Sequence, residues 1–207
     1  MKDTWNEYFI DDDETKALKN NLGINNKNEL SIKEKEIVTD KLVDLELNPI
    51  EGNFDSTHLK NIHYYLFNDI YPFAGQYRTC SMAKTRDFLE PSKIASWLDN
   101  ELTKLNNGIK EVQSLDYYAH FLSEEYYNLM YIHPFREGNG RSVREFLREF
   151  VIAKNNELPF DIELDFSKMD PEQFLLGVQY KLMYPSILEM EFRKALVNLE
   201  LKNEKHM

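Results

Sequence analysis

The residues best suited to chemistry in this chain lie together in one segment, His133-Pro-Phe-Arg-Glu-Gly-Asn-Gly-Arg-Ser-Val-Arg144. The segment combines a histidine, a carboxylate, two glycines that let the backbone approach an anion, and basic side chains. The glycines stand where a helix is predicted to begin, so unpaired amides and the positive end of the helix dipole face whatever binds there. These features predict a site for the phosphates of a nucleotide.

His133 is the candidate base of this segment. Pro134 steers the backbone of the histidine away from helical geometry, and an unperturbed pKa of roughly 6.5 suits proton abstraction from a hydroxyl. A lone histidine is more often a packed or surface residue, but the neighbouring groups favour a functional role. Glu137 is either a solvated carboxylate or a magnesium ligand, since magnesium is commonly held by one carboxylate plus substrate phosphates. Phe135 is interpreted as a core anchor.

Arg141 and Arg144 lie one turn apart at the start of the helix predicted over 141–153. A structural interpretation is an ion pair between Arg141 and Glu145, worth roughly a few tenths of a kcal/mol. Beside a glycine-flanked helix start, arginines placed against the dipole are more typical of phosphate ligands. The buried face of this helix is predicted to contain Val143, Phe146, Leu147, Phe150 and Val151.

Size and composition favour one mainly helical domain over 1–207. With 36 acidic and 25 basic residues, the net charge of −11 argues against nucleic-acid partners and against adhesion to anionic membranes. A single cysteine, Cys80, excludes an internal disulfide and thiolate zinc motifs. We find no signal core and no membrane-spanning run, so a soluble, cytoplasmic protein is expected.

Apolar residues recur mostly at helical spacing, which predicts a mainly α fold. Ser31-Ile-Lys-Glu34 has the form of a capping box and predicts that a helix begins there. Residues 76–90 are predicted to form a short hairpin, and Asn106-Asn-Gly108 a turn between helices. The expected helices cover 31–47, 56–70, 92–106, 115–131, 141–153, 171–183 and 186–201. Leu59, Ile62, His63, Leu66 and Phe67 share one face of the second, and Leu188, Phe192, Ala195 and Leu199 one face of the last.

The segment from His133 to Arg144 matches the pattern His-x-Phe-x-Asp/Glu-Gly-Asn-Gly-Arg-x-x-Arg of Fic domain proteins at every specified position. Segments 15–24, 48–55 and 69–78 also resemble that family, so the resemblance covers roughly residues 15–200. It implies a Fic-type helical bundle with a short β-hairpin flap beside the active-site loop. Residues 1–14 would be a variable lead-in, about 50–185 the catalytic core, 186–201 a C-terminal helix and 202–207 a tail.

The resemblance implies a protein adenylyltransferase, which transfers AMP from ATP to a Ser, Thr or Tyr hydroxyl of a target protein, with self-modification as a further outcome. His133 would take the hydroxyl proton, and Glu137 would hold Mg²⁺ between the α and β phosphates. Nucleotide binding is assigned to Lys84, Arg136, Gly138, Asn139, Gly140, Arg141 and Arg144, with Arg141 on the β and Arg144 on the γ phosphate. The flap residues Thr85, Arg86, Asp87 and Phe88 would align the target by strand addition.

The chain departs from the family pattern in its flap and in its regulation. Met82-Ala-Lys84 lacks the glycine of the usual Ser-Lys-Gly, which makes the flap contacts less certain than the motif. The inhibitory pattern Ser/Thr-x-x-x-Glu-Gly/Asn, whose glutamate pairs with the second motif arginine, is absent. Three alternatives stay open: an antitoxin protein supplies the glutamate, Glu191 supplies it in an unusual register, or no group does. In the second case, Glu191→Gly would raise AMP transfer.

Other activities of the same fold compete with this interpretation. Uridylylation, phosphorylation and phosphocholine transfer are alternatives, but Glu137 and the Gly-Asn-Gly sequence favour AMP. A silent nucleotide-binding module is disfavoured because it would be free to lose His133. A homo-oligomer is compatible with the sequence.

Overall fold

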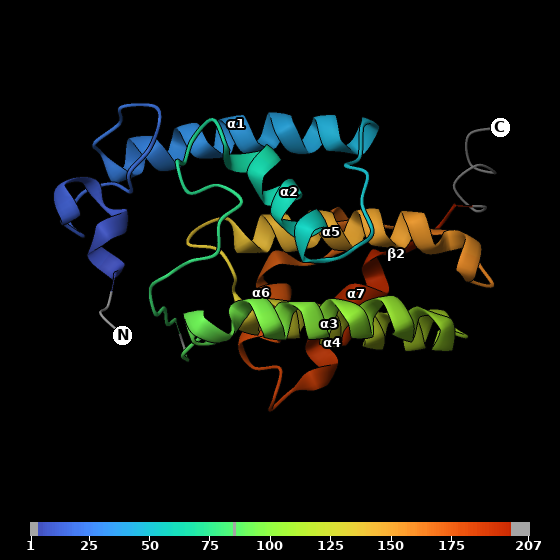
Figure 1. Cartoon of the computed structure of the whole chain (residues 1–207). Coiled ribbons are helices and arrows are strands. Elements are labelled where there is room, and N and C mark those ends of the chain that lie inside the picture. Colours follow the sequence, from blue (N-terminus) through green and yellow to red (C-terminus); the bar gives the residue numbers. More distant parts are fainter. Residues whose placement is uncertain (1–3, 85, 200–207) are drawn as a thin grey trace. The chain divides into compact units, whose positions relative to one another are not determined.

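Helices make up most of the computed structural model, which describes residues 4–84 and 86–199 (Figure 1). The α-helices of these residues are α1 (Lys27–Leu47), α2 (Ser56–Phe67), α3 (Ile94–Gly108), α4 (Leu115–Ile132), α5 (Asn139–Lys154), α6 (Pro171–Gln179) and α7 (Pro185–Ala195). The strands are β1 (Ile162–Leu164) and β2 (Leu196–Asn198). The predicted mainly α class is confirmed, whereas the predicted tail 202–207 and the flap residue Thr85 lie outside the described residues.

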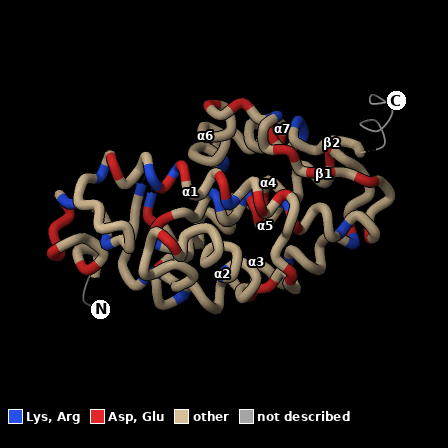
Figure 2. The backbone as a smooth tube through the Cα atoms, turned by 90° about the horizontal axis from the view of Figure 1, so that it is seen from above, with Lys and Arg blue, Asp and Glu red and all other residues tan. Residues whose placement is uncertain are grey.

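The chain divides into two compact units, each made of two stretches: 1–98 with 132–142, and 99–131 with 143–207. Acidic and basic positions are interspersed along the chain in both (Figure 2). Within the described ranges, no helix is both long and apolar enough to cross a membrane. The assignment of 1–207 to one domain stays a prediction.

In the first unit, α1 begins earlier than predicted and packs against α2. The Asn26 side-chain oxygen accepts hydrogen bonds from the backbone amides of Asn28 (2.9 Å) and Glu29 (3.1 Å), which makes Asn26 the N-cap. The capping box at Ser31 is therefore wrong. Glu34, its supposed partner, is a buried residue inside the helix.

The second helix, α2, is capped by the Asp55 carboxylate, which accepts from the His58 amide at 2.9 Å. It ends at Phe67, three residues before the predicted Ile70. Its predicted apolar face is confirmed, because those side chains are fully buried: Leu59, Ile62, His63, Leu66 and Phe67. This face places a histidine in the core of the first unit.

The segment 76–90 forms a short hairpin rather than extended strands. Ala83 and Asp87 make an isolated antiparallel bridge, and the Phe88 amide donates to the Met82 carbonyl at 3.0 Å. The Lys84 amide donates to the Arg86 carbonyl at 3.1 Å. We call this segment the flap.

In the second unit, the predicted turn at Asn106-Asn-Gly108 is wrong, because α3 continues through it to Gly108. The Asn106 side-chain amide donates to the Leu102 carbonyl at 2.9 Å, one turn back along the helix. A Cβ at Gly108 would lie 2.6 Å from the Phe121 ring, so this glycine allows close packing rather than chain reversal.

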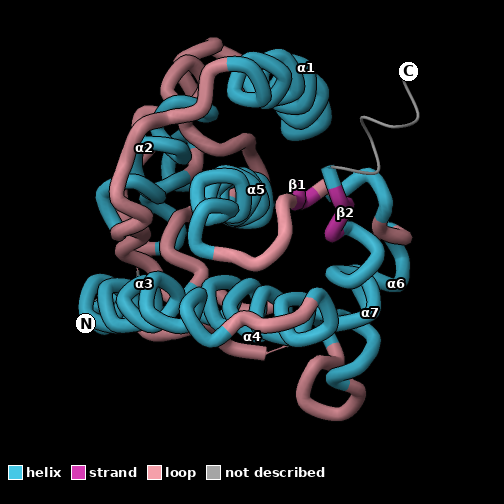
Figure 3. Tube along the Cα trace, turned by 90° about the vertical axis from the view of Figure 1, so that its right-hand side faces the viewer, coloured by secondary structure: helices cyan, strands magenta, loops and turns pink. Residues whose placement is uncertain are grey.

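The last predicted helix also ends early. Helix α7 stops at Ala195, and β2 then pairs antiparallel with β1, with Leu196 opposite Leu164 (Figure 3). Both leucines are buried. Leu188, Phe192 and Ala195 of the predicted apolar face are buried in α7, whereas Leu199 lies beyond the end of this helix. Gly177 lets α6 approach α7 closely, since a Cβ there would lie 2.8 Å from the Leu188 backbone.

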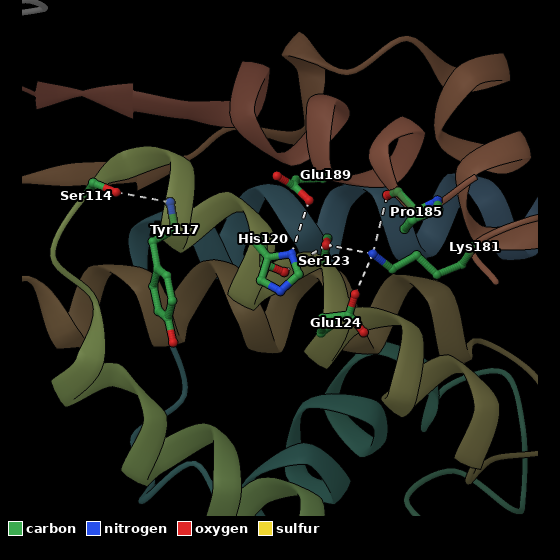
Figure 4. Close-up of polar contacts among 8 residues, drawn as sticks. All are labelled: Ser114, Tyr117, His120, Ser123, Glu124, Lys181, Pro185 and Glu189. Atoms are coloured by element: carbon green, nitrogen blue, oxygen red, sulfur yellow. Dashed lines mark hydrogen bonds and ion pairs between the residues drawn. The ribbon is translucent and has the colours of Figure 1, made fainter. Parts of the chain in front are cut away.

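Polar contacts fix the turn between α6 and α7 to α4 (Figure 4). The buried Lys181 amine lies 2.6 Å from a Glu124 carboxylate oxygen, 3.2 Å from the Ser123 hydroxyl and 3.4 Å from the Pro185 carbonyl. His120 Nδ1 lies 3.1 Å from a Glu189 carboxylate oxygen. The Lys181 ion pair compensates for burying a charge.

Candidate active site

His133 leaves the end of α4 in an uncommon conformation, with φ of 47°, and its side chain is buried. Such a positive φ is strained for a residue other than glycine, and strained backbone often marks functional sites. The Phe88 ring of the flap stacks on the imidazole, with ring centroids 3.8 Å apart and the planes 5° apart. The flap therefore contacts the predicted base directly.

Arg78, itself a residue of the flap segment, holds this conformation through hydrogen bonds. Its guanidinium is buried and donates to the carbonyls of His133 (2.7 Å), Cys80 (2.7 Å) and Leu89, while Ile132 O lies 3.3 Å away. The Arg78 amide also donates to the Pro134 carbonyl at 2.8 Å. One side chain thus ties both ends of the flap to the histidine loop.

The loop after His133 is closed by Asn139. Its side-chain oxygen accepts from the Phe135 amide at 2.8 Å, and its side-chain nitrogen donates to the Phe135 carbonyl at 2.7 Å. Phe135 is fully buried, as predicted for a core anchor. The Asn139 side chain is therefore engaged in shaping the loop, and its predicted binding to phosphate stays a prediction.

Gly138 makes the turn into α5 with φ of +80°. A Cβ at this position would lie 2.3 Å from the Phe67 ring, so both the conformation and the packing require glycine. Helix α5 begins directly afterwards at Asn139. Its first amides have no intrahelical acceptors, as at helix starts that bind anions, and their binding to phosphate stays a prediction.

His63 supports this turn from the core of the first unit. Its Nδ1 accepts from the Gly75 amide at 2.8 Å, so Nε2 carries the proton and donates to the Glu137 carbonyl at 2.9 Å. Burial lowers the pKa of His63 to about 4. The ring also stacks on Phe135, with centroids 3.8 Å apart. A neutral His63 thus positions the Glu137 backbone at neutral pH.

The Glu137 side chain is 42% exposed and therefore accessible from solvent. Its Oε1 accepts from the Gly138 amide at 2.9 Å. The described ranges contain no group of three or more histidine, cysteine or acidic side chains that could hold a metal by themselves. The site therefore fits magnesium only in the predicted form, one carboxylate plus phosphate oxygens.

Arg141 extends toward α1. Its guanidinium donates to a carboxylate oxygen of Glu34, and Tyr71 donates its hydroxyl hydrogen to the other oxygen. The Phe67 ring lies 4.8 Å from the guanidinium carbon. The alternative pairing with Glu145 is wrong, because Glu145 instead accepts from Arg148 at 2.6 Å and 2.9 Å.

Arg136 is buried and packs among aromatic rings of the first unit. Its guanidinium carbon lies 4.1 Å from the Trp5 ring, 5.2 Å from that of Phe9 and 5.5 Å from that of Tyr8. These contacts give Arg136 a packing role, and its assignment to nucleotide binding stays a prediction.

Arg144 belongs to the second unit, where it contacts Tyr126. Burial raises the pKa of the Tyr126 phenol, and Arg144, which donates a hydrogen bond to it, opposes the rise. The buried face predicted for α5 is confirmed, because these side chains are fully buried: Val143, Phe146, Leu147, Phe150 and Val151.

The Glu191 side chain is buried. One carboxylate oxygen accepts from the Asp170 amide at 2.7 Å, and the other lies 2.6 Å from the Lys194 amine. Asp170 is the N-cap of α6, so Glu191 stabilises the start of that helix. An inhibitory role for Glu191 stays a prediction.

Among the described flap residues, those predicted to contact the nucleotide or the target are at least partly exposed. Lys84 and Asp87 are exposed, and Arg86 is half-buried. Their exposure is compatible with docking a target strand, which stays a prediction together with the nucleotide role of Lys84.

Sequence reasoning missed the supporting residues Glu34, Tyr71 and Arg78 and the role of His63. Arg78 and Tyr71 lie within the segment 69–78 that was singled out, but nothing local shows which loop they bind. His63 carried a clearer signal, because a histidine on an apolar helix face needs buried partners.

The model of the Fic/DOC family matches residues 53–151. Over 165 residues the chain is 32% identical to "Probable protein adenylyltransferase y4lH" of Sinorhizobium fredii, covering 78% of this chain and 81% of that protein. Over 153 residues it is 34% identical to "Protein adenylyltransferase VbhT" of Bartonella schoenbuchensis, covering 72% of this chain. The match spans only 32% of VbhT. The chain therefore belongs to the Fic/DOC family, as its motif predicts.

Solved structures show the same fold. The N-terminal Fic domain of a VirB-translocated Bep effector protein from Bartonella quintana has a TM-score of 0.80 at 23% identity, covering 97% of this chain and 96% of that one. BepC from Bartonella tribocorum, solved with bound AMPPNP, has a TM-score of 0.79 at 22% identity, covering 95% and 98%. At these identities the likeness supports the fold prediction alone.

Proposed function

We propose that this chain is a protein adenylyltransferase that transfers AMP from ATP to a hydroxyl group of a target protein. The observation that carries the proposal is the loop from His133 to Gly138, which holds a buried histidine, an accessible carboxylate and the open N-terminus of α5 in one short span. The names of the relatives VbhT and y4lH denote the same activity, which supports the proposal.

In this reaction His133 takes the proton from the target hydroxyl as its oxygen attacks the α phosphorus. The new bond joins that oxygen to phosphorus, the bond to the bridging oxygen of the β phosphate breaks, and pyrophosphate leaves. The protonated imidazole then returns its proton to solvent. Phe88 and Arg78 restrict the ring and backbone of His133, so the base is held in place before the substrate arrives.

The phosphates would lie on the amides at the start of α5, where the helix dipole favours negative charge. Arg141 would contact the β phosphate and Arg144 the γ phosphate, while Lys84 and Arg136 remain assigned to nucleotide binding. Glu137 would hold Mg²⁺, which when bound offsets the charge that develops on the phosphates. An extended segment of the target would dock along Thr85, Arg86, Asp87 and Phe88.

Incubation with ATP labelled at the α phosphate, Mg²⁺ and cell lysate tests the reaction. We expect label on protein with the wild type and none with His133→Ala. His120→Ala is the matched control, because His120 is a half-exposed histidine that pairs with Glu189 and should leave labelling unchanged. Label that persists in His133→Ala, or that appears only from γ-labelled ATP, would overturn the proposal.

Inhibition of the enzyme would act at the same site. A separate antitoxin protein that supplies a glutamate to Arg144 remains a candidate partner. The same labelled ATP also tests self-modification: in a reaction without lysate, self-modification would place label on the chain itself.

A further inference from the structure

We propose that Glu34 is a positioning residue that holds Arg141 away from Glu137, so that the Glu137 carboxylate stays available to a metal ion. This inference rests on the proposed function, because it concerns the same site. Nothing in the motif pattern includes Glu34, which lies in α1 more than a hundred residues earlier in the chain, with a sequence separation of 107 from Arg141.

The surroundings of Glu34 suit it to bind the Arg141 guanidinium. Its side chain is only 11% exposed, and its two carboxylate oxygens accept from different donors, Arg141 on one side and Tyr71 on the other. Burial, followed by the charge of Glu34, raises the pKa of the Tyr71 phenol, so this hydroxyl remains a donor at working pH. Tyr71 therefore fixes the carboxylate that Arg141 meets.

Arg141 has a second carboxylate within reach. The same guanidinium nitrogen that binds Glu34 lies 3.6 Å from Glu137 Oε1. Glu137 precedes Arg141 by four residues and lies in the loop before α5, so the loop geometry brings its carboxylate close to the guanidinium. The guanidinium therefore lies between two carboxylates that compete for it.

Distance and burial both favour the pairing of Arg141 with Glu34 over its pairing with Glu137. The Glu34 contact is the shorter one, and the Glu137 side chain is 42% exposed against 11% for Glu34, so solvent screens the Glu137 pair more strongly. Phe67, 4.8 Å from the guanidinium carbon, closes one face of the arginine. Glu34, Tyr71 and Glu137 also line one pocket of roughly 320 Å³. The two carboxylates that compete for Arg141 therefore lie beside space that solvent or a ligand can reach.

Removing the charge of Glu34 should redirect Arg141 to Glu137, because a partly buried guanidinium without its partner seeks the nearest carboxylate. A Glu137 paired with arginine offers less negative charge to Mg²⁺. Loss of groups that orient a metal ligand typically weakens metal affinity by roughly 10- to 100-fold. We therefore expect a change in the magnesium requirement rather than a general loss of folding.

The test is isothermal titration of a non-hydrolysable ATP analogue into the wild type and Glu34→Gln at a series of Mg²⁺ concentrations. We expect the half-saturating Mg²⁺ concentration to rise about tenfold in Glu34→Gln. Glu34→Asp keeps the charge and should restore part of the affinity, and Tyr71→Phe, which leaves the Glu34 charge in place, should change it less than Glu34→Gln does. Thermal unfolding identifies variants that are folded.

An unchanged half-saturating Mg²⁺ concentration in folded Glu34→Gln would overturn the positioning role while leaving the proposed function standing. A wild type that binds no analogue at any Mg²⁺ concentration would overturn the proposed function and this inference with it. If Glu34→Gln does not fold, the comparison passes to Glu34→Ala, a second variant without the charge, where a half-saturating concentration equal to that of the wild type counts against the inference.

Discussion

The Phe88 ring lies parallel to the imidazole of His133, with ring centroids 3.8 Å apart and 5° between the planes. Phe88 comes from the flap and His133 from the loop after α4. Arg78 donates to the carbonyl of Leu89, the residue after Phe88, and to that of His133. The position of the proposed base is therefore set by residues far from it in sequence. The motif alone does not fix it.

Replacing Phe88 by alanine should lower AMP transfer by about two- to tenfold at saturating ATP. An aromatic stack of this kind is worth roughly 0.5 to 1.5 kcal/mol, and its loss frees the ring of His133 to leave its reactive orientation. Rates measured with α-labelled ATP check this, with Phe88→Tyr as the control that keeps the stack. A Phe88→Ala rate equal to that of the wild type would show that the stack does not position the base.

The part of the site that is contiguous in sequence was predictable, and the part that is assembled in three dimensions was not. The proposed roles of His133, Glu137 and Gly138 follow from residue type and spacing within one short segment. Glu34 and Arg78 contact the site from segments far from it in sequence, and an isolated glutamate or arginine is more often solvated. Their roles require the fold.

The errors in the fold have the same origin. Asn26 and Ser31 are both good helix caps, and local sequence does not decide between them. The strand Leu196–Asn198 has only three residues, and it depends on pairing with Ile162–Leu164, which local apolar spacing does not reveal. The types of Asn106 and Gly108 favour a turn, but both lie in α3, where Asn106 bonds the Leu102 carbonyl and Gly108 packs against Phe121.

The buried carboxyl group of Glu125 should make the stability of the protein depend on pH. It is buried in the second unit, its Oε2 has no hydrogen-bond partner among the described residues, and burial, aided by the nearby charge of Glu101, raises its pKa to about 8. The folded protein thus binds this proton more tightly than the unfolded chain. The corresponding stability is fully present below pH 4.5, the ordinary pKa, and is lost as the pH rises through 8.

Glu125→Gln, which is neutral at every pH, should therefore stabilise the protein at pH 8 and have little effect near pH 4. The gain should grow by roughly 1.4 kcal/mol for each pH unit between the two pKa values, as an upper bound. Urea unfolding at several pH values measures it, with the exposed Asp99→Asn on α3 as the control. A gain of equal size at pH 4 and pH 8 would contradict a raised pKa.

Substitution of Glu191 distinguishes an inhibitory role of this glutamate from a structural one. Because its carboxylate caps the start of α6 through Asp170 and pairs with Lys194, Glu191→Gln should lower the free energy of unfolding by about 1–3 kcal/mol. AMP transfer per folded molecule should stay unchanged. Urea unfolding and the α-label assay measure the two effects, and Glu189→Gln, whose side chain is 38% exposed, is the control that should cost at most about 1 kcal/mol. A rise in AMP transfer in Glu191→Gln, with stability retained, would instead assign Glu191 the inhibitory role and leave no need for an antitoxin.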